Sequence, residues 1–385
     1  MKKSVSVVFE ASPMVDNQKT GVGYYVDRLM RAMSENESQA IRLDGFFFDF
    51  FGRRGKKAPA LPRVRFHKIR FSPGKLLSAC RRLGFQPPLE FFIPRGSDVV
   101  LFTNYVSLPL LRRRKTALVV YDLGYLDHPE YIQPKNLAYL QRFCSRSIRT
   151  ADLIVTISEY TRQRLLHHFP DLTARIIVTH IPPAPLTPQA PSILPPSLAK
   201  KGVMHKKYIL YVGTVEPRKN IQNLIEAYVH LPAKTRSQYS LVLAGGKGWR
   251  DDAILTDIAQ KQADGFRIIQ TGYVTDVEKV ALYENAACFV LPSHYEGFGM
   301  PILEALSHGI PTAISNIQVF HEVAADAAVY FDKDNPQDIA ETITNLLSNT
   351  ALQQKLVVAG KKRLATFSWE KNSRIVAEAL RNLSS

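Results

Sequence analysis

The chain has 385 residues, enough for two domains, and its hydrophobic fraction of 45% allows each domain a large core. The net charge of +16 indicates a polyanionic partner, for which nucleic acid, an anionic membrane and a polyanionic small substrate are the candidates. Three separated cysteines without a CxxC pair exclude a disulfide or zinc framework and indicate a cytoplasmic protein, and the lack of any apolar run of about 20 residues predicts no transmembrane helix.

The first half of the chain alternates apolar strands with helical patterns. A strand at Val5–Phe9 precedes a glycine-bearing loop at Lys19–Gly23 and an amphipathic helix at Tyr24–Met33. This order of strand, glycine loop and helix is typical of a phosphate-approach unit. Ser158 is expected to cap a further helix. Other strands are expected at Val99–Phe102, Ala117–Val120, Leu153–Ile157 and Ile176–Thr179.

Positive charge is concentrated between residues 41 and 115, where lysines and arginines far outnumber acids. Within this region, the Phe-rich stretch Phe46–Lys57 has two interpretations. It lies on an anionic membrane, or it is a solvated loop whose aromatic side chains pack inside the protein.

A proline-rich segment divides the chain. The prolines that follow Ile181 exclude a regular helix or central strand there, so residues 186–206 are expected to be a semi-rigid linker. Residues 1–185 then form an N-terminal domain and residues 207–365 a C-terminal domain. The last segment, 366–385, is expected to be a helix that packs back on the N-terminal domain.

The second half repeats the alternation of strands and helices, with a helix opening at Asn220. Strands are expected at Tyr208–Val212, Leu241–Ala244, Phe266–Gln270 and Cys288–Leu291. Repeated βα units predict an α/β protein of two Rossmann-like parallel-sheet domains that face a cleft. Ligands of such sheets bind at the carboxyl ends of the strands, where the glycine loops fall.

The segment Glu296–Glu304 is the sharpest candidate site. Gly297 and Gly299 follow a strand, Pro301 suits the first position of a helix, and Gly309 suits its end. Glu304 is then expected in the first turn. Glycines before a helix N-terminus expose N–H groups to an anion or a hydroxyl-rich ligand, and the two carboxylates suit sugar hydroxyls. The plainer alternative is that Glu304 only favours the helix dipole and Glu296 is solvated.

Two further loops follow strands. In Gly213–Asn220, Arg218 and Lys219 lie at a strand-to-helix junction, as a diphosphate clamp requires, although a surface turn with ordinary charges is the alternative. Glycines 245, 246, 248 and 272 mark the other loops, which are either ligand loops or tight turns. None matches GxGxxG in a first βα unit, so a nicotinamide dehydrogenase is disfavoured.

At these motifs the chain resembles the retaining family-4 glycosyltransferases of the GT-B fold. The resemblance is carried by Tyr211–Asn220, Leu243–Trp249, Thr271–Asp276 and Glu296–Glu304, the last being the family's Glu-x7-Glu element. It continues through Ser315–Asn316 and Glu322–Ala324 to Phe367–Trp369. It extends more weakly into the first half at Thr20–Gly23, Phe102–Asn104, Tyr121–Leu123 and Ile157–Glu159.

The resemblance implies roles for individual residues. Arg218 and Lys219 bind the donor diphosphate, Glu304 holds the ribose hydroxyls, and Glu296 with the backbone of Gly297 and Phe298 holds the hexose. Further donor-site positions are Gly21, Gly23, Gly213, Gly245, Val274 and Gly299, of which Val274 lies near the base.

One departure concerns Tyr121, which stands where relatives often carry a catalytic histidine before Asp-Leu. Tyrosine donates a hydrogen bond but differs in charge and reach, so the catalytic assignment of Tyr121 and Asp122 is open. The alternative for Asp122 is a structural role, in which it orients a neighbouring side chain or caps a turn. Asp332 and Asp334 resemble a DxD metal site, but a polar turn before Pro336 is favoured, and no metal or other cofactor is expected.

The predicted function is transfer of a hexose from a nucleoside diphosphate sugar to a glycan or lipid-linked glycan, with retention of configuration. In its motifs the chain resembles bacterial mannosyltransferases of surface-polysaccharide assembly, and this resemblance implies GDP-mannose as the donor. A UDP- or dTDP-sugar is the alternative donor. Whether the protein also binds an anionic membrane is left open. If it does, its expected place is the inner face of the plasma membrane. Nucleic acid is not expected, since no motif for it is present. A non-catalytic scaffold that binds membrane or nucleic acid is the alternative from another class.

Overall fold

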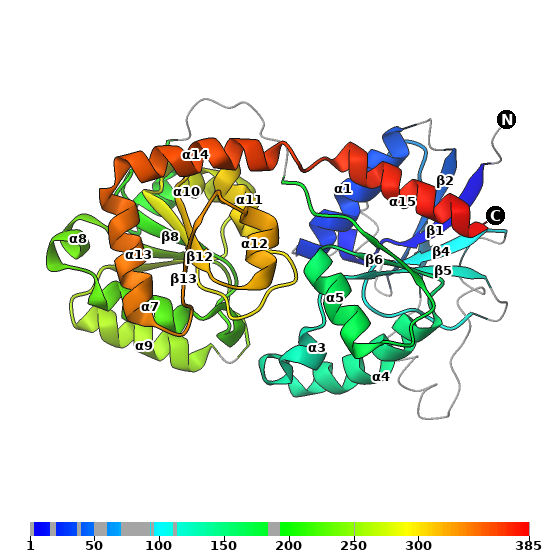
Figure 1. The fold of residues 1–385 in the computed structure, drawn as a ribbon, viewed down its shortest axis with the longest axis horizontal. Helices are drawn as coiled ribbons and strands as arrows, with labels where there is room; N and C mark the ends of the chain where they lie inside the picture. Colours follow the sequence, from blue (N-terminus) through cyan, green and yellow to red (C-terminus); the bar gives the residue numbers. More distant parts are fainter. Residues whose placement is uncertain are drawn as a thin grey trace. The chain divides into compact units, whose positions relative to one another are not determined.

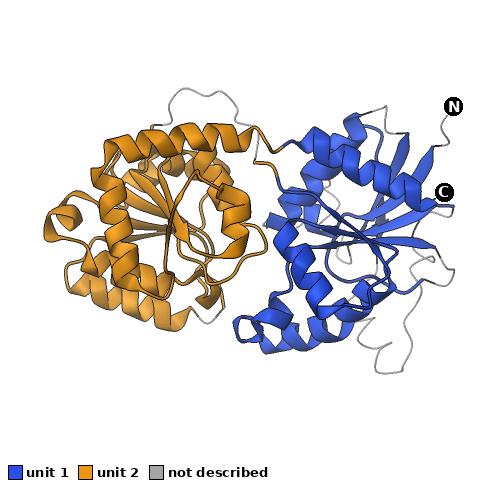
Figure 2. Cartoon of the chain, in the orientation of Figure 1, with its two compact units in different colours: residues 1–181, 368–385 blue, residues 182–367 orange. Residues whose placement is uncertain are grey.

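The chain divides into two compact units, which are described separately (Figure 2). Unit 1 comprises residues 1–181 and 368–385, and unit 2 comprises residues 182–367. The structure is a computed structural model that describes residues 4–15, 21–36, 40–49, 60–70, 93, 96–110, 114–183, 193–249 and 251–384.

Unit 1 is built on a seven-stranded parallel sheet with the strand order β3-β2-β1-β4-β5-β6-β7. The sheet turns back at the β1/β4 pair, so this pair is its topological switch point. The strands are β1 Val5–Glu10, β2 Ile41–Phe48, β3 Arg65–Ile69, β4 Val99–Phe102, β5 Lys115–Val120, β6 Leu153–Thr156 and β7 Arg175–Val178.

Helices cover both faces of this sheet, α1 and α15 on one and α3, α4 and α5 on the other (Figure 1). Their bounds are α1 Gly21–Glu35, α3 Gly124–Asp127, α4 Pro134–Thr150, α5 Glu159–His168 and α15 Trp369–Ser384. Short 3-10 helices occur at Ser12–Met14 (η1) and Pro129–Tyr131 (η5). The predicted cap is confirmed, because the Ser158 side chain accepts a hydrogen bond from the Thr161 N–H.

Unit 2 is built on a six-stranded parallel sheet with the order β10-β9-β8-β11-β12-β13. Its switch point is the β8/β11 pair. The strands are β8 Tyr208–Val212, β9 Ser240–Ala244, β10 Ile268–Gly272, β11 Cys288–Leu291, β12 Thr312–Ser315 and β13 Val329–Phe331. The first four correspond to the predicted strands; β8, β9 and β11 are fully buried because helices cover the sheet, whereas the edge strand β10 is partly exposed.

The helices of unit 2 alternate with its strands (Figure 1). Their bounds are α6 Pro196–Ala199, α7 Ile221–His230, α8 Ala233–Gln238, α9 Asp252–Ala263, α10 Asp276–Asn285, α11 Met300–Ser307, α12 Gln318–Ala324, α13 Pro336–Ser348 and α14 Thr350–Leu364, with a 3-10 helix η6 at Pro217–Lys219. The fold class is therefore α/β with two Rossmann-like parallel sheets, as predicted.

Four expectations differ from the structure. The loop expected at Lys19–Gly23 is helical from Gly21 onward, so Gly21 and Gly23 lie in the first turn of α1. The proline-rich segment contains the short helix α6, which begins with Pro196. Proline is tolerated there because the first N–H groups of a helix have no partner within it. Leu198 of α6 is 1% exposed, so this part of the expected linker packs into unit 2.

The Phe-rich stretch is the third difference. Phe46, Phe47 and Phe48 belong to strand β2, and Phe46 and Phe47 are buried in unit 1. None of these three residues lies in a loop, and the buried Phe46 and Phe47 are not available to a membrane. Residues 50–57 lie outside the described residues. The fourth difference is Glu304, discussed below. In the part of the chain that the structure describes, none of the helices has the length and apolar character needed to span a bilayer.

Candidate functional site

Three glycine loops lie side by side at the carboxyl ends of β8, β9 and β10. The Gly213 N–H donates to the Ala244 carbonyl at 2.9 Å, and the Gly245 N–H donates to the Gly272 carbonyl at 3.0 Å. A Cβ atom on Gly245 would lie 1.9 Å from the Gly213 carbonyl oxygen. Gly245 is thus required for close approach of two backbones, and this approach places the candidate donor loops at one sheet edge.

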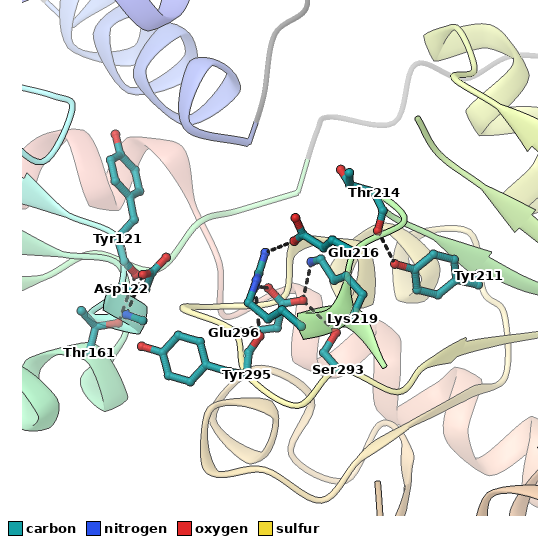
Figure 3. A network of polar contacts seen from close by, with 12 residues as sticks. Tyr121, Asp122, Thr161, Tyr211, Thr214, Glu216, Lys219, Ser293, Tyr295 and Glu296 are labelled. Atoms are coloured by element: carbon teal, nitrogen blue, oxygen red, sulfur yellow. Dashed lines mark hydrogen bonds and ion pairs between the residues drawn. The ribbon is translucent and has the colours of Figure 1, made fainter. Parts of the chain in front are cut away.

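Three side chains converge on the Glu296 carboxylate (Figure 3). Lys219 Nζ donates to Oε1 at 2.5 Å, Ser293 Oγ donates to Oε1 at 2.9 Å, and Arg218 Nη1 donates to Oε2 at 2.7 Å. Arg218 also donates through Nη2 to Glu216 Oε1 at 2.8 Å. We call Arg218, Lys219, Glu216 and Glu296 the charge cluster.

Burial and charge act against each other in the charge cluster. Burial alone would raise the pKa of Glu296, which is 7% exposed, but the positive charges of Lys219 and Arg218 outweigh it and lower this pKa to about 2. The pKa of Lys219 is lowered, mainly by burial and next by the positive charge of Arg218, although the negative charge of Glu296 acts to raise it. Glu296 is therefore ionised at neutral pH. Its burial and its partners contradict the alternative that it is merely a solvated surface acid.

The charge cluster lies at the topological switch point of unit 2. Arg218 and Lys219 come after β8, and Ser293 and Glu296 come after β11, its neighbour in the sheet. The two segments are tied together by Asn220, whose φ of +57° is left-handed and whose side-chain amide donates to the Pro292 carbonyl at 2.9 Å. Ligands of open α/β sheets bind at this place.

The loop that carries Glu296 leads directly into α11. Gly297, Phe298 and Gly299 are buried, and Gly299 has a φ of +104° that few side chains tolerate. Gly299 is the N-cap, so α11 begins at Met300 with Pro301 as its second residue. Glu304 therefore lies in the second turn, and the prediction that placed it in the first turn is wrong. Gly309 follows the end of α11 with a φ of +65°, as expected.

Two side chains of α10 hold Glu304. Lys279 Nζ donates to Oε1 at 2.8 Å, and the Tyr283 hydroxyl donates to Oε2 at 2.9 Å. Tyr283 is fully buried, and burial followed by the charge of Glu304 raises its pKa well above the ordinary value. Glu304 is thus anchored by specific partners rather than placed by the helix dipole. Val274 lies half-buried on the loop between β10 and α10.

Tyr121 and Asp122 belong to unit 1, at the carboxyl end of β5. The Tyr121 hydroxyl donates to the Thr103 carbonyl at 2.9 Å, and its side chain is 4% exposed. Burial, followed by the neighbouring Tyr25 and Glu10, raises its pKa well above the ordinary value. Asp122 accepts from the Tyr105 hydroxyl at 2.9 Å and from the Gly124 N–H at 2.9 Å.

Tyr121 and Asp122 thus make different kinds of contact. The Tyr121 hydroxyl already has a buried partner within unit 1. Asp122 both orients Tyr105 and accepts from the N–H of Gly124 in the turn that leads into α3, as the alternative interpretation of it expected. Their roles in catalysis stay predictions. Gly21 and Gly23 also belong to unit 1, in the first turn of α1.

Several residues that contact the predicted site residues were not predicted from the sequence. Ser293, Glu216, Lys279, Tyr283 and Tyr105 each contact a candidate residue through a hydrogen bond. A signal existed for Lys279 and Tyr283, which are four residues apart on one helix, the spacing that places two side chains on one face. Ser293 gave no such signal. It reaches Glu296 only because of the way the loop between β11 and α11 folds, and loops have no regular spacing from which this contact could be predicted.

The Asp332–Asp334 motif forms a turn before α13. The Asp334 N–H donates to Asp332 Oδ1 at 3.0 Å, and the Asn335 side chain caps the helix. Across the described segments, no group of three or more His, Cys, Asp or Glu side chains is arranged to hold a metal ion.

Comparison with known proteins agrees with this geometry. The sequence profile of the family described as "Glycosyl transferases group 1" matches residues 198–363, which include the charge cluster. The chain is 34% identical over 260 residues to O-antigen chain mannosyltransferase B of Escherichia coli, covering 67% of this chain and 68% of that protein. It is also 34% identical over 188 residues to serotype-specific mannosyltransferase WbdA of Escherichia coli, covering 49% of this chain but 23% of WbdA.

Among solved structures, sucrose-phosphate synthase from Thermosynechococcus elongatus is similar in fold. It aligns with a TM-score of 0.73 at 17% identity, covering 98% of this chain and 99% of that one. The fold is GT-B. The chain belongs to the family of group 1 glycosyl transferases, and it is a glycosyltransferase enzyme.

Proposed function

We propose that the protein transfers mannose from GDP-mannose to a growing glycan or lipid-linked glycan of O-antigen type. The observation that carries the proposal is the pair of cations, Arg218 and Lys219, next to an ionised Glu296 at the switch point of unit 2. Two similar proteins that are described as mannosyltransferases of O-antigen or serotype-specific type support the choice of sugar. A UDP- or dTDP-sugar is the alternative donor.

In the proposed reaction, the bond between the anomeric carbon and the donor phosphate oxygen breaks while an acceptor hydroxyl attacks the same face of the sugar. Because attack and departure take place on one face, configuration is retained without a carboxylate nucleophile. A donor phosphate oxygen takes the proton of the attacking hydroxyl. Negative charge grows on the leaving diphosphate. Arg218 and Lys219 are proposed to stabilise this charge, Glu296 to hold the hexose and Glu304 the ribose.

The donor is tested by thermal shift with GDP-, UDP- and dTDP-sugars, because a ligand that binds only the folded state raises its stability. We expect the largest shift with GDP-mannose. The catalytic assignment is tested with Lys219→Ala, which should lower kcat by about 100-fold or more, the usual loss when one charge-stabilising donor is removed. Circular dichroism verifies that the variant folds. Near-normal turnover of a folded Lys219→Ala would overturn the assignment.

A membrane surface is proposed as the site where the acceptor is met, with helix α4 as the contact. Its exposed face carries Lys135, Tyr139, Arg142 and Arg146, spaced by four, three and four residues, and the helix contains no Asp or Glu. Tyr139 is 40% exposed. A basic helical face with an aromatic residue is complementary to anionic lipid headgroups.

This contact is tested by co-sedimentation with vesicles of phosphatidylcholine and phosphatidylglycerol. Arg142→Glu with Arg146→Glu should weaken binding by about tenfold or more, since each basic residue at an anionic surface contributes about 1 kcal/mol. The matched control is Lys361→Glu with Lys362→Glu on α14, which changes the net charge equally on another exposed helix. Equal losses in both variants would contradict a role for α4.

A further inference from the structure

The charge cluster contains an acid that the proposed function does not use. Glu216 precedes the 3-10 helix η6 in an extended conformation, and its carboxylate accepts from Arg218 Nη2 at 2.8 Å. Glu296 accepts from the other side of the same guanidinium at 2.7 Å and from Lys219. The two cations are thus matched by two carboxylates, and the formal charge of the cluster is zero.

The place of Glu216 is fixed by the backbone around it. The Val215 N–H donates to the Gly246 carbonyl at 3.0 Å, so the segment runs beside the Gly245–Gly248 loop. A Cβ atom on Gly248 would lie 2.3 Å from the Val215 carbonyl oxygen and 2.9 Å from the Glu216 Cβ. The Glu216 side chain is 19% exposed. Its charge is therefore held close to Arg218 with limited screening by solvent.

A negative charge beside a phosphate-binding arginine has a selective consequence. At neutral pH the released nucleoside diphosphate carries roughly one more negative charge than the sugar diester from which it came. Two uncompensated cations would consequently bind the product more tightly than the substrate. A fixed carboxylate next to them repels both ligands, but it repels the product more.

We propose that Glu216 is a positioning residue that weakens the hold of Arg218 on the released nucleoside diphosphate and so speeds product release. This inference rests on the proposed binding of the donor diphosphate by Arg218 and Lys219. It assigns to Glu216 a role in turnover that does not require contact with the reacting atoms.

The test is Glu216→Gln, which removes the charge but keeps a side-chain oxygen that can accept from Arg218. Affinities for GDP, UDP and the corresponding sugar donors are measured by calorimetry in the full chain. The variant should bind the nucleoside diphosphate about tenfold more tightly, the change that ~1.4 kcal/mol of lost repulsion produces. Its gain for the sugar donor should be smaller, and kcat should fall together with KM.

The matched control is Glu226→Gln on α7, which breaks an ion pair with Lys261 in the same unit. Its affinities should equal those of the wild type. Two results would overturn the inference: an unchanged ratio of product to donor affinity in Glu216→Gln, or weaker binding of both ligands, since weaker binding means that Glu216 only orients Arg218. If no nucleoside diphosphate binds, the inference also fails.

The two proposals fail separately. If UDP binds in place of GDP and Glu216→Gln still favours the product, the role of Glu216 stands and GDP-mannose is excluded as the donor. If GDP-mannose is the donor but Glu216→Gln leaves the affinity ratio unchanged, the proposed function stands and the role of Glu216 is overturned.

Discussion

Glu304 illustrates how a side chain is prepared for a ligand by its neighbours. Lys279 donates to one carboxylate oxygen and Tyr283 to the other, and both donors come from α10. A carboxylate fixed in this way loses little conformational entropy when it accepts further hydrogen bonds. This is the property that recognition of a ribose diol requires.

The role of Glu304 is tested with a deoxy ligand. If Glu304 holds the ribose hydroxyls, wild-type protein should bind a 2′-deoxynucleoside diphosphate about tenfold more weakly than the ribonucleotide, since hydrogen bonds to charged groups contribute about 1.5–3 kcal/mol. Glu304→Ala should bind both ligands with nearly equal affinity. Calorimetry measures the four values, and a deoxy penalty that persists in Glu304→Ala would assign ribose recognition to another residue.

At the scale of single residues, the sequence allowed the charged site residues to be predicted but not the side chains that contact them. Arg218, Lys219 and Glu296 were recognisable because they follow strands in glycine-bearing loops, and the structure brings all three together. Tyr105, which adopts a φ of +59° and donates to Asp122, lies in a loop whose path no local pattern determines.

The strand elements were predicted where apolar runs are continuous. β8, β9 and β11 are buried on both faces and are read easily. Of the strands that were not predicted, β2 and β3 carry charged and polar residues, including the buried Asp44, whose carboxylate accepts from His67 Nε2 at 3.2 Å. Polar pairs between neighbouring strands are invisible until the register is known.

The approach of β8 and β9 at their carboxyl ends depends on Gly245. Gly245→Ala places a Cβ atom 1.9 Å from the Gly213 carbonyl oxygen, so one backbone must move. We expect a loss of about 2 kcal/mol or more in the free energy of unfolding of unit 2, within the range of severe overpacking. The adjacent Gly246→Ala is the control, because its Cβ would meet no atom within 4 Å.

Urea unfolding followed by circular dichroism compares these two variants. Gly246→Ala should lie within about 0.5 kcal/mol of the wild type, as ordinary surface substitutions do. Donor affinity should fall only in Gly245→Ala. Equal stability of both variants would show that the two loops do not approach each other as closely as the structure indicates.

At the scale of the molecule, the division into two units gives each unit its own reporter. The chain has two tryptophans; Trp249 belongs to unit 2, and Trp369 on α15 belongs to unit 1. Helix α15 is far from the rest of unit 1 in sequence, yet its Val376, Ala377 and Leu380 are buried there against α1 and the sheet. Trp369→Phe and Trp249→Phe backgrounds therefore report on one unit each.

The charge cluster predicts how acid affects unit 2. The pKa of Glu296 falls from an ordinary value of 4.5 to about 2 in the folded state, because Lys219 and Arg218 outweigh burial. A lowered carboxyl pKa contributes stability that is fully present above pH 4.5 and is lost as the pH falls toward 2. The contribution is about 3 kcal/mol at neutral pH.

Glu296→Gln removes this contribution, because glutamine cannot ionise and leaves the two cations with a single carboxylate, that of Glu216. In the Trp369→Phe background, unit 2 of the variant should be less stable than the reference at neutral pH, and the two should converge as the pH falls from 4.5 toward 2. Urea titrations of Trp249 fluorescence at successive pH values measure the difference. In the Trp249→Phe background, the free energy of unfolding of unit 1 should depend on pH in the same way whether residue 296 is Glu or Gln. A gap in unit 2 stability that stays constant down to the lowest pH would mean that the lowered pKa of Glu296 does not stabilise the fold.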